Sequence, residues 1–161
     1  METINDVFAE FAAIFAGEIE ATEEIVDADR LARERLDFSV ESLEAVDEYL
    51  AHLREVLPEE AGGAEWSRTI LWGGAYLGEV MRRNSPRGLE WVDYDDFVTD
   101  FPETRALLGE ERALEVCAFL TMGDGGFTLP INKVCRFLAE GPENSVRFYA
   151  SVECAGEQPQ D

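Results

Sequence analysis

Apolar residues recur at the spacing of an α-helix through most of the first half of the chain. The clearest stripe consists of Leu43, Val46, Leu50, Leu53 and Leu57. Charged residues lie on the opposite face, and Pro58 ends the pattern because proline cannot continue a helix. The spacing predicts a helix with one buried face, on which each large side chain contributes about 1.5–3 kcal/mol when fully buried.

Two further stripes predict helices, one from Ile4 to Ile19 and a sparser one over residues 21–35. In the first, Ile19 continues the stripe beyond Gly17. In the second, acidic residues precede arginines, which is the order that the helix dipole favours. We therefore expect two helices before the leucine-rich one.

A fourth helix is predicted over residues 64–83, with a stripe that includes Trp66, Ile70, Leu77 and Met81. Gly74 and Gly78 lie four residues apart in this segment, and each glycine costs about 1 kcal/mol relative to alanine inside a helix. We expect another helix or strand to approach the helix closely at these glycines.

The pattern changes after residue 88. Strands are predicted at 89–94, 114–122 and 127–129, with a buried helical turn as the alternative at 114–122 and a turn at 123–126. Helices are predicted at 102–109, from Pro130 to Gly141, and from Asn144 or Ser145 onward. This order predicts an α+β class, in which N-terminal helices pack on a small antiparallel sheet with C-terminal helices. We expect one domain over residues 1–155, with 1–35 as an acidic helical extension and 156–161 as a disordered tail.

Acidic residues outnumber basic ones, and the net charge is -22. Residues 1–60 hold 18 acidic and 4 basic residues, a net charge of -14. Such a surface repels nucleic-acid backbones and anionic membranes, which argues against both as partners, and it attracts a basic protein. Solubility alone is the alternative explanation of the charge.

The cysteines are Cys117, Cys135 and Cys154, an odd number without C-x-x-C spacing, and we expect reduced thiols. No apolar run approaches the roughly 18–20 residues that span a bilayer, and no basic segment follows Met1. We therefore expect a cytoplasmic protein.

Five short segments, in chain order, resemble an uncharacterised family of bacterial, actinobacterial-type domains of unknown function. They are Leu36–Ser39, Gly74–Val80, Glu90–Val92, Pro130–Lys133 and Gly141–Tyr149. The resemblance spans residues 36–150 and implies a bacterial α+β domain. It implies no activity, and the acidic N-terminal segment lies outside it.

The sequence contains no motif of a known catalytic, cofactor or metal site. His52 is the only histidine, it lies off the apolar face, and we expect it to be exposed. No G-x-S-x-G elbow or cysteine cluster accompanies it, so neither a catalytic triad nor a zinc site is predicted. The glycines of 123–126 lack the Lys-Ser/Thr pair of a phosphate loop.

A candidate ligand site lies where the fourth helix ends. Glu79, Arg82 and Arg83 share that end, and Trp91 follows in the first strand. Arginines and an aromatic wall suit a small anion or an acidic peptide. The alternative is structural: Glu79 pairs with the arginines at helical spacing, and the arginines complement the helix dipole.

Asp93, Asp95 and Asp96 form the densest carboxylate cluster and extend the candidate site. Phe97 and Val98 follow where a calcium loop would need oxygen ligands. We expect an acidic loop after the strand.

Three hypotheses follow. The leading one is a non-catalytic interaction protein, similar in principle to an immunity protein or a nucleic-acid mimic, which binds a basic partner through its acidic helices. The second is a small-molecule-binding or hydrolytic domain with a pocket near Glu79, Arg82 and Trp91. The third is a homodimer that forms through apolar residues of the first helix.

Overall fold

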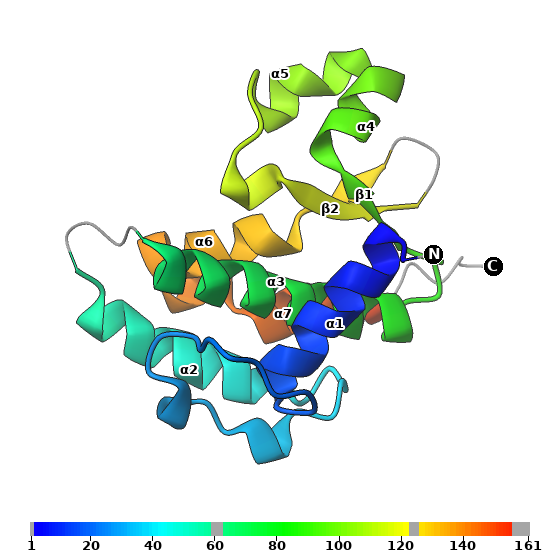
Figure 1. The fold of residues 1–161 in the computed structure, drawn as a ribbon. Helices are drawn as coiled ribbons and strands as arrows, with labels where there is room; N and C mark the ends of the chain where they lie inside the picture. Colours follow the sequence, from blue (N-terminus) through cyan, green and yellow to red (C-terminus); the bar gives the residue numbers. More distant parts are fainter. Residues whose placement is uncertain (1, 59–62, 123–125, 156–161) are drawn as a thin grey trace.

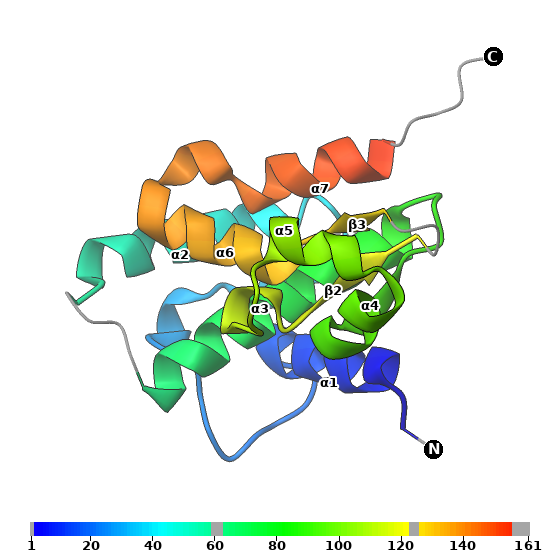
Figure 2. The same cartoon turned by 90° about the horizontal axis from the view of Figure 1, so that it is seen from above.

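Helix α3 (Ala64–Asn84) runs through the middle of the fold (Figure 1). The computed structural model describes residues 2–58, 63–122 and 126–155. Every residue of α3 from Trp72 to Met81 is buried, so all sides of its middle are covered. Figure 2 shows α1 (Ile4–Ala16) on one side of α3, and α6 (Pro130–Glu140) and α7 (Val146–Ala155) on the other. No helix in the described residues is long and apolar enough to cross a membrane.

Helix α1 begins in a capping box, in which Thr3 and Asp6 bond each other's backbone N–H groups. It ends at Gly17, whose φ of 85° is left-handed. The prediction that Ile19 continues the helix was therefore wrong, because the glycine provides a helix stop. Phe8 and Phe15 of α1 are buried in the main core.

The predicted helix over residues 21–35 does not form. Residues 17–42, which we call the acidic loop, contain only two 3-10 turns, Ala28–Arg30 and Arg33–Arg35. Their few apolar residues are buried as separate anchors instead of lying on one helical face. Helix α2 (Leu43–Val56) follows as predicted and buries Leu43, Val46, Leu50 and Leu53 of its stripe. Leu57 lies just beyond the helix and is only partly buried.

The sheet contains three antiparallel strands in the order β1 (Glu90–Asp93), β2 (Ala118–Thr121) and β3 (Phe127–Thr128). Trp91 pairs with Leu120, and Thr121 pairs with Phe127. This confirms the predicted α+β class and its strands, although residues 114–116 form a 3-10 turn before β2. The predicted turn at 123–126 lies largely outside the described residues.

The two faces of the sheet belong to two cores. Trp91 and Leu120 face the main core around α3, whereas Phe119 faces a smaller one. Above that second face lie α4 (Tyr94–Asp100), the turn Pro102–Thr104 and α5 (Arg105–Leu108) (Figure 1). The expected acidic loop at 93–96 was wrong, because Asp93 caps α4 by accepting a hydrogen bond from the Asp95 N–H.

The two C-terminal helices complete the main core. Gly141 ends α6, and the turn Pro142–Asn144 leads into α7. Asp47 of α2 accepts hydrogen bonds from the backbone N–H of Val146 and from the Ser145 hydroxyl, at 2.8 and 2.6 Å. A carboxylate from one helix thus caps the start of another and fixes α7 beside α2.

The expected close approach to the glycines of α3 is confirmed. A methyl group at Gly74 would lie 2.6 Å from Cγ1 and 2.7 Å from Cα of Ile131, at the start of α6. A methyl group at Gly78 would lie 2.3 Å from Cζ2 of Trp91. Glycine at these positions lets α6 and the sheet pack directly on the α3 backbone.

This packing predicts opposite effects for two neighbouring substitutions. Gly74→Ala should lower the free energy of unfolding by about 1–3 kcal/mol, because the α6 backbone must move. Gly73→Ala should raise it by up to about 1 kcal/mol through helix propensity, because its methyl group meets only Phe15, at an ordinary 3.5 Å. Urea denaturation measures both, and effects of the same sign would contradict the packing described.

Candidate functional site

Glu79 is a buried carboxylate held by three side chains. It is 1% exposed, and its Oε2 accepts hydrogen bonds from Trp91 Nε1 at 2.9 Å and from Arg82 Nη1 at 3.0 Å. Arg83 Nε lies 3.6 Å from Oε1. The structure thus brings together four of the predicted site residues and confirms the pairing of Glu79 with both arginines.

The groups around Glu79 join α3 to its neighbours. Arg82 Nε also donates to the carbonyl of Leu89, and the Trp91 ring stacks on Phe8 with centroids 4.3 Å apart. The Arg83 guanidinium lies 3.7 Å from the centre of the Phe38 ring. In the described residues no buried side-chain nitrogen or oxygen lacks a hydrogen-bond partner, and the contacts of this group link α3 to β1 and α1. A ligand-binding role for these residues stays a prediction.

The carboxylates of Asp93 and Asp95 share Arg112 as their partner instead of the Glu79 group. Arg112 Nη2 lies 3.1 Å from Asp93 Oδ1, and its Nε lies 3.8 Å from Asp95 Oδ2. Asp96 is exposed on α4. These contacts hold the start of α4 against the segment that precedes β2.

His52 is less exposed than expected. Its side chain is 16% exposed, and Nε2 lies 2.8 Å from Asp27 Oδ2, across the boundary between α2 and the acidic loop. In the described residues, no group of three or more His, Cys, Asp and Glu side chains is placed to hold a metal ion. The three cysteines are free and partly buried.

The acidic loop is attached to the core by apolar anchors and buried hydrogen bonds. The anchors are Ile25, Val26, Leu31, Leu36 and Phe38, none more than 8% exposed. Thr69 of α3 accepts from the Val26 N–H at 2.9 Å, and Tyr49 of α2 donates to the Val26 carbonyl. Burial raises the pKa of Tyr49, which keeps this hydroxyl a donor.

A second attachment lies at the other end of the loop. Tyr76 of α3 accepts from the Phe38 N–H at 2.9 Å and bonds the Ser42 hydroxyl at 2.7 Å. Asn84 Nδ2 donates to the Phe38 carbonyl at 2.9 Å. Both ends of the irregular segment are therefore fixed to the most buried helix.

The exposed side of this loop is densely acidic. All acidic residues of 2–58 are exposed except Asp47, which is partly buried. We define the acidic surface as the exposed carboxylates of the loop and of the adjoining side of α2: Glu18, Glu20, Glu23, Glu24, Asp27, Asp29, Glu34, Asp37, Glu41, Glu44 and Glu48. Arg35 bridges its two parts through Glu48 at 2.9 Å and Glu44 at 3.9 Å.

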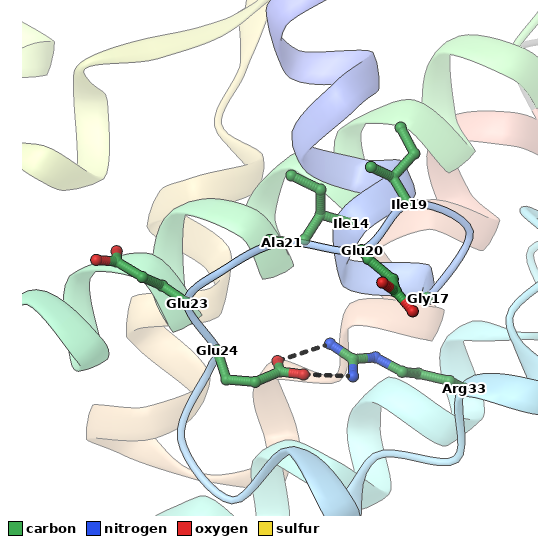
Figure 3. Close-up of a pocket in the computed structure, with 8 residues that line it drawn as sticks. All are labelled: Ile14, Gly17, Ile19, Glu20, Ala21, Glu23, Glu24 and Arg33. Atoms are coloured by element: carbon green, nitrogen blue, oxygen red, sulfur yellow. Dashed lines mark hydrogen bonds and ion pairs between the residues drawn. The ribbon is translucent and has the colours of Figure 1, made fainter.

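A hollow of about 340 Å³, which we call the loop hollow, lies where α1 meets the acidic loop (Figure 3). Ile14 and Ile19 give it apolar lining, and Glu20, Glu23 and Glu24 give it carboxylates. Figure 3 shows that the side chains of Glu24 and Arg33 face each other. Two hydrogen bonds join the Arg33 guanidinium to the Glu24 carboxylate, each with an N–O distance of 3.1 Å. This hydrogen bonding holds the pKa of Glu24 below its ordinary value.

The sequence indicated that residues 17–42 are strongly acidic, but it did not predict that they form an anchored loop. Of the anchors, Ile25, Val26 and Leu31 predicted a sparse helical stripe, which the structure does not contain. Their irregular spacing, between a glycine stop and a leucine-rich helix, was the available signal for an anchored loop.

The contacts of Glu79 predict that even a conservative substitution at this residue lowers the stability of the fold markedly. Glu79→Gln should lower the free energy of unfolding by about 1.5–3 kcal/mol, because Arg82 loses a buried charged partner. Glu48→Ala removes an exposed pair, and its effect should stay below about 1 kcal/mol. Chemical denaturation of both variants tests this, and equal effects would show that the buried pair contributes no more than a surface one.

Comparison with models of protein families, with curated proteins and with solved structures finds no match. The resemblance to uncharacterised bacterial domains therefore stays a prediction, and the functional argument depends on the geometry alone.

Proposed function

We propose that this chain is a non-catalytic interaction protein whose acidic surface binds a basic protein partner. The observation that carries the proposal is the acidic loop: a long, irregular, strongly acidic segment held in one shape by buried contacts. We further propose that it acts in the cytoplasm, where its free thiols stay reduced.

Solubility does not explain an ordered acidic loop. Fixing one residue of backbone costs about 1–2 kcal/mol of conformational entropy, and a disordered acidic tail would serve solubility equally well. Loops longer than about 12–15 residues without regular structure are uncommon in small domains, and those that are not disordered or linker segments are usually functional. The buried anchors offset the cost of ordering and fix the carboxylates in space.

The backbone of the loop also contains strain. Asp27 and Phe38 are the non-glycine residues with positive φ in the described part of the chain, at 45° and 67°. Such conformations cost about 1–3 kcal/mol when surrounding contacts enforce them, and they concentrate at functional sites. His52 holds the Asp27 side chain, while Tyr76 and Asn84 hold the Phe38 backbone. The shape of the loop is maintained against a local preference for other conformations.

A surface of this kind suits a partner rich in lysine and arginine. Fixed carboxylates steer a basic protein toward the surface and require little reordering on binding. In the loop hollow, Ile14 and Ile19 can contact the methylene stem of a long basic side chain, while Glu20 faces its charge. Immunity proteins and nucleic-acid mimics use the same combination of acidic charge and fixed shape.

Charge reversal tests the proposal. The triple variant Glu20→Lys, Asp29→Lys and Glu34→Lys changes exposed loop residues. Its matched control, Glu103→Lys, Glu110→Lys and Glu111→Lys, makes the same change in net charge near α5, at the far end of the molecule (Figure 1). Both sets of residues are exposed, so both variants should fold.

Each protein is immobilised in about 0.05 M salt, exposed to a lysate from bacterial cells and washed with rising salt. The native chain and the control should retain the same basic protein, which should elute as the Debye length shrinks well below 10 Å. The loop variant should retain at least about tenfold less. Equal retention by the two variants, or a retained protein that is not basic, would contradict the proposal.

A further inference from the structure

Lys133 is the only lysine of the chain, and it lies partly buried between β3, α6 and α7. Its Nζ donates to Asn144 Oδ1 at 3.0 Å and lies 5.2 Å from the centre of the Tyr149 ring. Within the described part of the chain, Lys133 forms no ion pair. In a protein with 35 acidic and 13 basic residues, a partly buried cation without a carboxylate partner is unexpected.

A second cation lies beside it. Arg136 follows three residues later, on the same side of α6, and its Nη2 lies 3.2 Å from Glu140 Oε1. Burial and the positive charge of Arg136 lower the pKa of Lys133, and the nearby Glu140 carboxylate opposes this shift. Glu140 offsets part of the repulsion between the two cations, and an anion bound in the space that both cations line would offset more of it.

The two cations line a hollow of about 240 Å³ between β3, α6 and α7. Phe127 and Tyr149 give it aromatic walls, and Asn132 and Thr128 give it neutral polar groups. No carboxylate lines it, and Glu140 is not among its lining residues. This set of groups is suited to a negatively charged group rather than to a cation.

A second hollow, of about 280 Å³, adjoins the first and shares Thr128, Lys133 and Tyr149 with it. Phe148 and Val152 line it and are 67% and 58% exposed, unusually high for large apolar side chains. Glu143 and Glu153 also line this second hollow. Because they share lining residues, we treat the two hollows as one groove. Arg136 lines only the first part, Lys133 lines both parts, and the apolar and acidic groups line the second.

Tyr149 is held firmly where the two parts meet. Its hydroxyl accepts a hydrogen bond from the Leu129 N–H at 3.1 Å and bonds the Thr128 hydroxyl. Because both hydrogen bonds involve the hydroxyl, they fix the position of the ring and do not cover its face. The groove is thus formed before any ligand enters, as small-molecule sites usually are.

We propose that this groove binds a small monocarboxylate with an apolar body, whose carboxylate lies between Lys133 and Arg136 and whose body lies along Tyr149 toward Phe148 and Val152. The arginine fork and the lysine provide charge-assisted hydrogen bonds, and Asn132 provides an amide donor. Glu143 and Glu153 disfavour a second negative charge at the far end. The groove does not share residues with the acidic surface, so this inference stands or fails independently of the proposed function.

Isothermal titration with 3-phenylpropionate tests the inference, with 3-phenylpropionamide as the uncharged analogue of the same shape. The carboxylate should bind saturably, and the amide should bind at least about tenfold more weakly.

Lys133→Met and Arg136→Met should each weaken binding of the carboxylate by about tenfold or more. Arg112→Met, which removes a cation beside α4, should leave it unchanged, and Phe148→Ser should weaken 3-phenylpropionate but not acetate.

Thermal unfolding establishes that each variant is folded, and Arg136→Met at an exposed position provides the charge test if Lys133→Met does not fold. Three results would overturn the inference: no saturable binding at about 10 mM carboxylate, equal affinity for acid and amide, or unchanged affinity in the folded cation variants.

Discussion

The close contact of α6 and the sheet with the glycines of α3 is the constraint on which the rest of the structure depends. Gly74 brings Ile131 onto the helix backbone, and Gly78 brings in the Trp91 ring. Once Trp91 is in place, its indole N–H donates to the buried Glu79, whose charge Arg82 and Arg83 balance. The same helix provides Tyr76, which anchors the acidic loop. One buried helix therefore positions the sheet, the C-terminal helices and the loop.

Sequence patterns predicted the elements that bury a regular stripe or end at a strong stop signal. The leucine stripe before Pro58, the glycine pair of α3 and the proline at the start of α6 each follow from local geometry, and they yielded the α+β class. The acidic loop could not be predicted in this way. Val26 and Phe38 are held by Thr69 and Tyr76, hydrogen-bond partners that lie 43 and 38 residues away, and periodicity carries no information about such contacts.

The candidate sites also differ in whether local sequence spacing could predict them. Glu79 and its arginines lie within one helical turn, so their pairing was predictable from spacing. Lys133, Phe127 and Tyr149 come from three separate elements and carry no local signature, and the groove emerges only when the fold brings them together. The molecule thus has two chemically opposite regions: a broad acidic surface on the loop and α2, and a small cationic groove between β3, α6 and α7. We propose a basic protein as the partner of the first and a small carboxylate as the ligand of the second.

The acidic loop is an ordered part of the fold instead of a flexible charged segment. Amide hydrogen exchange of the native chain tests this at Val26 and Phe38, whose N–H groups bond Thr69 and Tyr76. These two amides should be protected about as well as those in the middle of α3, because both hydrogen bonds are buried. Exchange at the rate of an unstructured peptide, while α3 stays protected, would contradict it.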